Sequence, residues 1–162
     1  MFKMILFVVI FSVGIVEAKK AADFIFLGWE KSYKLNNQTF ESDAHNAYLD
    51  IYVNELAKQP YIDEAKHFPP GSEIYKPLYN DTERRVFARL VIMVKMKPGY
   101  DPKNGDWWYG VYDKSGGEMY YQGRLKSCIA CHKDGKETDY TFSKSVNAEI
   151  QRLIFNPRRS KK

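Results

Sequence analysis

The feature that most restricts the fold is a long alternation of side chains between Arg85 and Lys97. Every second residue is apolar, and this set comprises Val86, Ala88, Leu90, Ile92, Val94 and Met96. The residues between them form a mixed set of Arg85, Phe87, Arg89, Val91, Met93 and Lys95. A period of two residues is typical of a β-strand, because successive side chains point to opposite faces of a sheet. The pattern predicts a strand with one face on a core and a mixed face that lines a pocket.

The neighbouring segments predict further strands with antiparallel connections. Ser72 to Tyr79 has the composition of a strand, and Pro77 places it at a sheet edge because proline cannot donate to a strand ladder. Asp106 to Lys114 and Glu118 to Gln122 flank the turn residues Ser115-Gly116-Gly117, as the two strands of a β-hairpin do.

Two helices are expected beside this sheet. From Ser42 to Lys58, apolar residues recur at helical spacing, at Ala44, Ala47, Tyr48, Ile51, Tyr52 and Leu56. Ser42 or Asp43 would cap this helix, and Pro60 would end it. Ser145 to Phe155 predicts a last helix, with an apolar side formed by Val146, Ile150 and Ile154. The expected fold class is mainly β (α+β), an antiparallel sheet with flanking N- and C-terminal helices.

The N-terminus has the composition of an export signal. Lys3 precedes an apolar run from Ile5 to Val16, and Ala18 is a small residue at the position that a signal peptidase reads. We expect residues 1–18 to be a cleaved signal peptide and residues 19–162 to form one domain, although an uncleaved anchor is the alternative. No later segment is long enough for stable membrane insertion. The net charge of +5 is scattered or lies in the basic C-terminal tail, which is weak support for nucleic-acid binding.

The chemistry of the chain is concentrated in Cys128-Ile129-Ala130-Cys131-His132, which has the C-x-x-C-H form of c-type haem attachment. Two thiols at this spacing reach the two vinyl groups on one edge of a porphyrin, and the adjacent imidazole reaches the iron. A redox dithiol, a zinc site completed by His45 or His67, and a plain disulfide are the alternatives. The motif predicts a single covalent haem c held by Cys128 and Cys131, with His132 as the iron ligand. Export fits this reading, since bacteria assemble c-type haem in the periplasm.

The second axial position of the iron has no clear candidate. A cytochrome for electron transfer usually presents Met or His there. The available residues are Met93, Met96, Met119, His45 and His67, and none has a recognisable ligand context. We therefore expect an open or weakly ligated site.

Several landmarks occur in an order that resembles the family of cytochrome P-460 and cytochrome c′-beta. They are Phe68-Pro69-Pro70-Gly71, the strand through Leu90 to Lys95, Gly105 to Gly110, the Cys128 to His132 motif, and Thr138 to Phe142. The resemblance covers the chain from about Trp29 onward. It implies a homodimeric periplasmic haem protein, largely antiparallel β, with five-coordinate iron, His132 as the proximal ligand and an open distal pocket.

The resemblance also implies two possible chemistries. One branch of the family oxidises hydroxylamine and has a bond between a lysine and the porphyrin, for which Lys76 is the candidate. The alternative for Lys76 is a surface lysine that blocks pairing at a sheet edge. The enzymes also place a carboxylate over the distal face as a proton acceptor. The stretch from Gln122 to Ser127 contains no acid, and Glu118 is the nearest earlier one, which speaks against hydroxylamine oxidation.

The other branch binds nitric oxide and related gases in an apolar pocket, and Phe68 and Phe87 are the candidates for its distal cap, although core packing explains either residue equally well. The leading hypothesis is binding of nitric oxide or a similar small ligand. Hydroxylamine oxidation comes second. Third comes simple electron transfer, for which the basic surface suits an acidic redox partner protein.

Overall fold

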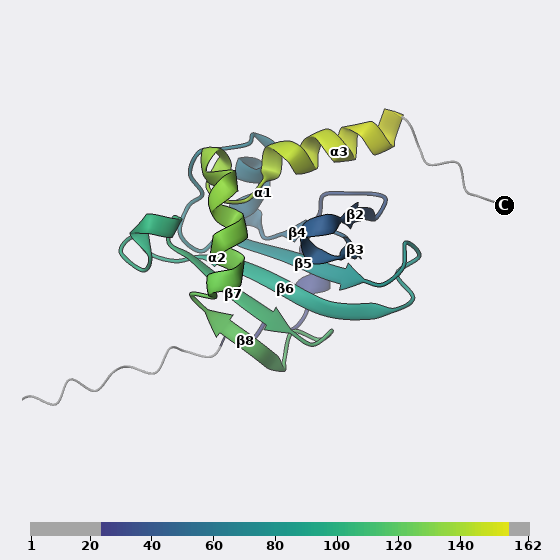
Figure 1. The fold of residues 1–162 in the computed structure, drawn as a ribbon, viewed down its shortest axis with the longest axis horizontal. Coiled ribbons are helices and arrows are strands. Elements are labelled where there is room, and N and C mark those ends of the chain that lie inside the picture. Colours follow the sequence, from purple (N-terminus) through teal and green to yellow (C-terminus); the bar gives the residue numbers. More distant parts are fainter. Residues whose placement is uncertain (1–23, 156–162) are drawn as a thin grey trace, which may run out of the picture.

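The computed structural model describes residues 24–155, and the expected signal peptide at residues 1–18 lies outside them. The described chain forms an eight-stranded antiparallel sheet with three α-helices (Figure 1), which confirms the expected fold class. Its strands are β1 (Tyr33–Lys34), β2 (Phe40–Ser42), β3 (Ala47–Leu49), β4 (Tyr52–Val53), β5 (Glu73–Tyr79), β6 (Phe87–Lys95), β7 (Trp107–Tyr112) and β8 (Met119–Gly123). The helices are α1 (Glu55–Ile62), α2 (Lys126–His132) and α3 (Ser143–Phe155). The 3-10 turns are η1 (Trp29–Lys31), η2 (Asp43–His45), η3 (Pro102–Asn104) and η4 (Lys133–Thr138).

The strands pair in the order β1-β4-β5-β6-β7-β8, and β3 pairs with both β2 and β5. The sheet separates two hydrophobic clusters. One contains Ile74, Leu78, Val91, Met93, Trp107 and Tyr109 together with side chains from all three α-helices. The other contains Tyr75, Leu90, Ile92, Val94, Trp108 and Tyr112 together with Phe26 and Trp29 of the N-terminal segment. The helices and the N-terminal segment therefore cover opposite faces of the sheet.

The alternation that predicted β6 is confirmed from Arg89 to Met96, whereas Val86 and Ala88 are exposed and β6 begins only at Phe87. Leu90, Ile92 and Val94 pack in the second cluster, whereas Val91 and Met93 lie on the face that the helices cover. β6 is central, with β5 on one side and β7 on the other. The mixed face lines a pocket, as the sequence predicted, and this pocket is the candidate site.

The predicted hairpin is also confirmed, as β7 and β8. Its turn is closed by a hydrogen bond from the Asp113 amide to the Glu118 carbonyl at 2.9 Å. Gly116 lies in this turn with φ of 75°, and an added Cβ would lie 2.8 Å from the Phe26 carbonyl oxygen. The Gly116 carbonyl accepts a 2.9 Å bond from the Phe26 amide, which ties the N-terminal segment to the sheet. A glycine is needed here, because a side chain at this position would clash with Phe26 and would also disfavour the positive φ.

The helix predicted from Ser42 to Lys58 is wrong over most of its length. The segment forms β2, η2, β3 and β4, and helix α1 begins only at Glu55, after Asn54, whose side chain accepts from the Ala57 amide at 3.1 Å. A second pattern in the same residues explains the error, since Ala47, Leu49, Ile51 and Val53 alternate and are all buried. α1 also passes through Pro60 to Ile62, closed by a 2.9 Å bond from the Asp63 amide to the Gln59 carbonyl.

The edge position predicted for the strand containing Pro77 is wrong as well, because β5 lies inside the sheet. The Pro77 carbonyl accepts from the Asp50 amide at 3.3 Å. The amide and carbonyl of one residue in an antiparallel strand face the same neighbour. The missing N–H of Pro77 therefore faces the irregular stretch between β3 and β4 rather than β6, and the ladder with β6 stays intact.

The last helix is confirmed and begins slightly earlier than predicted, at Ser143. Val146 packs against the helix-side cluster and Leu153 is part of it, whereas Ile154 is half exposed. Asn147 donates to the carbonyls of Tyr61 and Ile62 at 3.1 and 3.2 Å, which joins α3 to the end of α1. Within residues 24–155, no helix has the length and apolar character needed to span a membrane.

Candidate functional site

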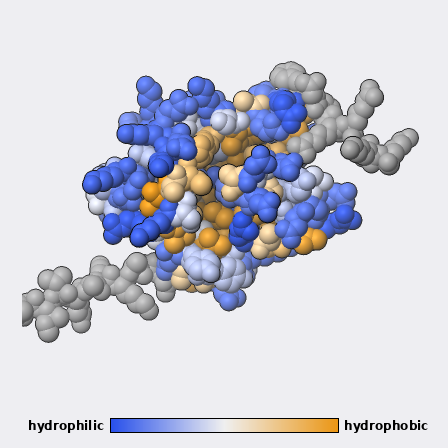
Figure 2. All heavy atoms as spheres, in the orientation of Figure 1, coloured by the Kyte–Doolittle hydropathy of each residue, from blue (hydrophilic) through white to orange (hydrophobic). Residues whose placement is uncertain are grey.

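A cavity of about 480 Å³ lies between the helix-covered face of the sheet and α2. Its walls come from the segment Phe40 to Ile51, from β5, β6 and β7, from α2, and from the start of α3. Figure 2 shows hydrophobic side chains gathered in a hollow on this face, surrounded by hydrophilic ones. The volume falls within the range of small-molecule and cofactor pockets.

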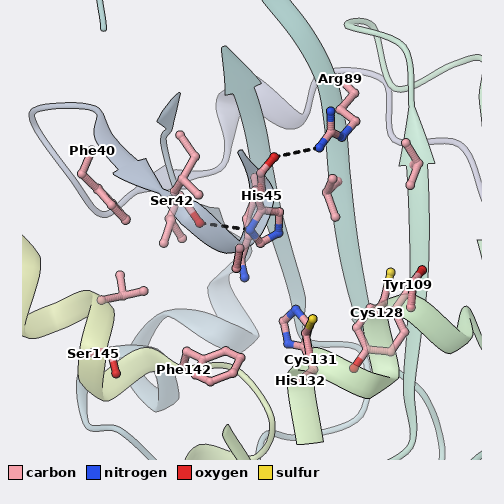
Figure 3. Close-up of a pocket in the computed structure, with 18 residues that line it drawn as sticks. Phe40, Ser42, His45, Arg89, Tyr109, Cys128, Cys131, His132, Phe142 and Ser145 are labelled. Carbon is pink, nitrogen blue, oxygen red and sulfur yellow. Dashed lines mark hydrogen bonds between the residues drawn. The ribbon is translucent and has the colours of Figure 1, made fainter. Parts of the chain in front are cut away.

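Helix α2 carries the C-x-x-C-H motif on one wall of this cavity. Cys128 and Cys131 are one helical turn apart, so both thiols lie on the cavity side together with His132 (Figure 3). Leu125 and Ile129 pack against the helix-side cluster, and the Ile129 amide donates to the Leu125 carbonyl at 3.0 Å. Both thiols are free, which leaves the plain disulfide unsupported. We call Cys128, Cys131 and His132 the α2 wall.

His132 is held as a neutral imidazole. The residue is 6 % exposed, and its Nδ1 donates to the Tyr140 carbonyl oxygen at 2.6 Å. A carbonyl can only accept, so Nδ1 carries the proton and Nε2 carries the lone pair that a metal requires. Burial, with a smaller contribution from the charge of Lys76, lowers the pKa of His132 to about 3. The ring lies between Tyr109 and Phe142, at centroid distances of 5.3 and 5.5 Å.

The carbonyl that fixes His132 belongs to a segment in an unusual conformation. Asp139, Tyr140 and Phe142 all have φ between 51° and 65°. The left-handed region is unfavourable for non-glycine residues, by on the order of 1–2 kcal/mol each. Contacts from distant parts of the chain must therefore stabilise this segment.

Asp139 makes those contacts. Its buried carboxylate accepts from Lys95 Nζ at 2.5 Å and from the Phe68 amide at 2.7 Å. Its carbonyl accepts from Trp107 Nε1 at 2.7 Å. The residues around Phe68, Lys95, Trp107 and Asp139 were separate landmarks in the sequence. The structure brings them together behind His132.

Lys76 lines the same cavity. It lies on β5 opposite Val91 of β6 and is 4 % exposed, so the interpretation as a surface lysine at a sheet edge is wrong. Among the described residues it has no hydrogen bond or ion pair. Burial lowers the pKa of Lys76 to about 8, while the nearby Cys128 thiol acts in the opposite direction. The neutral, nucleophilic amine is therefore accessible close to physiological pH.

The two phenylalanines predicted as a distal cap lie outside the cavity. Phe68 packs edge-on against Tyr61 and Trp107 in the helix-side core, with centroids 6.4 and 5.6 Å away. Phe87 packs against Tyr79 at 5.9 Å. Phe40 and Phe142 line the cavity instead. Phe142 belongs to the last sequence landmark, whereas nothing in the sequence pointed to Phe40.

Ser42, His45 and Arg89 lie on the wall that faces α2 (Figure 3). Lys76 of β5 lines the same cavity, and we call these four residues the opposite wall. Ser42 Oγ lies 3.2 Å from His45 Nδ1, and Arg89 Nη2 donates to the His45 carbonyl at 3.0 Å. Burial, followed by the positive charges of Lys76 and Arg89, lowers the pKa of His45 to about 4. The sequence singled out His45 as one of five possible axial residues and as a possible ligand of a zinc site.

The other four axial candidates do not line the cavity. Met93 is buried in the helix-side core, and Met96 and Met119 pack against the cluster on the other face of the sheet. His67 is exposed. No Asp or Glu of the described chain lines the cavity either, and Glu118 lies in the exposed β7–β8 turn.

The residues present fit the haem group that the motif implies. The walls are mainly apolar, the thiols and a neutral imidazole share one side, and the buried Tyr109 hydroxyl lines the cavity without a hydrogen-bond partner. A buried polar group of this kind normally has a partner, and a bound group with acceptor atoms would supply one. In the described chain, no group of three or more Cys, His, Asp and Glu side chains converges as a metal site.

Comparison with protein families identifies the family of this chain. The model of the family described as Cytochrome P460 matches residues 27–143, which is more than half of the chain and includes every segment that lines the cavity up to the start of α3. A search of curated proteins found no match.

Proposed function

Because the chain belongs to the cytochrome P460 family and is thus a haem-binding cytochrome, we propose that its haem is attached through thioethers to Cys128 and Cys131 and that His132 Nε2 binds the iron. The shared orientation of the three side chains and the 2.6 Å bond that fixes the His132 tautomer support this assignment. When bound, haem would supply a redox-active iron with a position open to a small ligand.

The function that the site supports best is binding of nitric oxide or a related small nitrogenous ligand at that position. The observation that carries it is the composition of the opposite wall, where no methionine or carboxylate of the described residues reaches the cavity. Its one ligating side chain, His45, is held by Ser42. Phe40, Val91 and Val111 give the cavity apolar surface beside these polar groups, which suits a small ligand such as nitric oxide.

Optical spectra test this function directly. Ferric and ferrous protein would be recorded with and without nitric oxide and carbon monoxide. We expect a high-spin ferrous spectrum and binding of both gases. A stable low-spin ferrous spectrum, typical of Met–His or bis-His ligation and resistant to carbon monoxide, would contradict ligand binding and favour simple electron transfer to a partner protein.

A second candidate, hydroxylamine oxidation, is favoured by the position of Lys76. Its buried amine, with a pKa of about 8, lines the cavity together with Cys128. A bond from Nζ to a porphyrin carbon replaces one N–H and one C–H, so its formation needs an oxidant such as a peroxide. Mass spectrometry of the tryptic haem peptide decides the matter. If no peptide containing Lys76 remains attached, the crosslinked enzyme is ruled out.

The proposal also includes export to the periplasm and assembly as a homodimer. The support for export is the apolar run after Lys3 and the covalent haem motif, and the support for a dimer is the family resemblance. N-terminal sequencing of the secreted protein and its mass in solution test the two parts separately.

A further inference from the structure

A second histidine faces His132 across the cavity. Figure 3 shows His45 on one side, and His132 with Cys131 on the other. His45 ends the turn η2, which is closed by a 3.0 Å bond from the Asn46 amide to the Asp43 carbonyl. Asn46 follows in the left-handed conformation, with φ of 46°. The backbone therefore places His45 at a defined point of the opposite wall.

Two polar residues that also line the cavity hold His45, one at its side chain and one at its backbone. Ser42 Oγ contacts Nδ1 at 3.2 Å, and Arg89 anchors the backbone through the His45 carbonyl at 3.0 Å. Within residues 24–155, Nε2 of His45 has no hydrogen-bond partner. One ring nitrogen is thus engaged by the protein, and the other remains available.

The surroundings of His45 keep its ring uncharged. The charged groups near it are Lys76 of β5 and Arg89 of β6, both cationic and both lining the cavity, and no carboxylate from α2 or α3 lines the cavity to balance them. Together with burial they oppose formation of an imidazolium. A neutral imidazole offers one donor and one acceptor, so His45 can form a hydrogen bond without introducing a charge.

We propose that His45 forms a hydrogen bond with the ligand in this cavity and thereby favours small ligands with a polarised or hydrogen-bearing nitrogen over carbon monoxide. This inference rests on the proposed function and specifies the ligand class of the same site. The buried Tyr109 hydroxyl also lines the cavity without a hydrogen-bond partner, but the Tyr109 ring lies against His132 on the α2 side. Ser42 acts as a positioning residue, because its hydroxyl contacts His45 Nδ1 and restrains the ring.

The test compares two probes in the haem-loaded protein. Azide binds the ferric form through a polarised nitrogen, and carbon monoxide binds the ferrous form as a weak hydrogen-bond acceptor. His45→Leu should weaken azide binding roughly tenfold and change carbon monoxide affinity by less than about twofold. His45→Gln, which keeps a polar terminus, should restore part of the azide affinity. His67→Leu, at an exposed histidine outside the cavity, should change neither.

The positioning role of Ser42 has its own measurement. Ser42→Ala should weaken azide binding by about threefold, which is less than His45→Leu does, because the ring stays but loses one restraint. Ser115→Ala, in the β7–β8 turn, is the control. Thermal unfolding of each variant establishes that it remains folded. An effect of Ser42→Ala on azide equal to that on carbon monoxide would indicate a purely structural role and would count against the proposal.

Three outcomes separate the inference from the function beneath it. If the wild-type protein binds neither probe, the proposed function itself fails. If the wild type binds both and His45→Leu binds azide equally well, only the role of His45 fails. If the wild-type ferric spectrum is low-spin and becomes high-spin in His45→Leu, His45 is an iron ligand, and the hydrogen-bonding role is overturned.

Discussion

Each wall of the cavity carries one histidine, and the two are held differently. His132 donates to a backbone carbonyl at 2.6 Å and is 6 % exposed. His45 relies on a serine hydroxyl at 3.2 Å and is half-buried. A backbone carbonyl anchored by Asp139 moves little, whereas a serine side chain can change rotamer. The α2 wall is therefore built for one fixed geometry, and the opposite wall can adapt to what enters the cavity.

The walls also differ in charge. The α2 wall presents thiols and a neutral imidazole, while the opposite wall presents Lys76 and Arg89, and no acidic residue in the described part of the chain lines the cavity to balance them. Charge in a pocket with apolar walls acts more strongly than charge on the surface. We expect substitutions in the α2 wall to affect cofactor retention, and those in the opposite wall to affect ligand binding and pH dependence.

The largest effect should come from removing the thiols. In Cys128→Ala/Cys131→Ala, haem has no thioether and should separate completely from the polypeptide in a denaturing gel stained for haem. His45→Leu, in the opposite wall, should retain covalent haem at the wild-type level. Retention of haem by the double variant would mean that another side chain carries a covalent bond, and the division between the walls would then be incorrect.

The next effect concerns the support of His132. Asp139→Asn leaves Lys95 without its partner in a mostly buried position, which should reduce the free energy of unfolding by about 3 kcal/mol. Urea unfolding measures this loss. Glu137→Gln is the matched control, since its 3.9 Å ion pair with Lys144 is exposed and should matter by less than about 0.5 kcal/mol. Equal effects of the two variants would show that Asp139 does not anchor the segment behind His132.

The same contrast explains what the sequence could predict. The α2 wall is contiguous, and one helical turn determines the relation between Cys128, Cys131 and His132. The central strand was equally clear, because the alternation around Val91 covers most of β6. Both predictions depend on local periodicity, which the sequence contains directly.

The opposite wall combines residues from three separate segments, so its composition depends on sheet register and on contacts between distant residues. His45 was hidden because the residues around it also fit a helical period. Whether Lys76 is buried depended on whether the strand containing Pro77 lies at the edge of the sheet. It does not, because the side of Pro77 that lacks an N–H faces the irregular stretch between β3 and β4. Phe68 and Phe87 were chosen as apolar residues near the right strands, but packing directs both away from the cavity.

The third prediction concerns the buried charge of Lys76. Its pKa is lowered from 10.5 to about 8, so at pH 7 the folded protein holds a charge that burial disfavours. Lys76→Met should therefore raise the free energy of unfolding by roughly 2 kcal/mol at pH 7. Between pH 8 and 10.5 the unfolded wild type binds more protons than the folded one, so wild-type stability rises there and the gain should shrink.

Chemical unfolding of both proteins at pH 7 and pH 10 measures this difference. Lys97→Met, at an exposed lysine just after β6, should show neither the gain nor its pH dependence. If the gain does not change with pH, Lys76 does not titrate in the folded protein, and a covalent bond from its amine becomes the favoured explanation.

The smallest predicted effect is on the charge state of His45. Burial lowers its pKa most, then Lys76, then Arg89, so Arg89→Met should raise the pKa from about 4 by roughly half a unit. An NMR titration of the ferrous carbon monoxide form measures this pKa. The wild type loses stability as pH falls from 6.5 to 4, since the unfolded state takes up the proton first, and the variant should lose less.

The control is Arg85→Met, which removes an exposed charge that pairs with Asp81 and Glu83 and should leave the pKa of His45 unaffected. If the His45 pKa were unchanged in Arg89→Met, the opposite wall would not act as an electrostatic unit, and the two walls would differ in geometry rather than in charge.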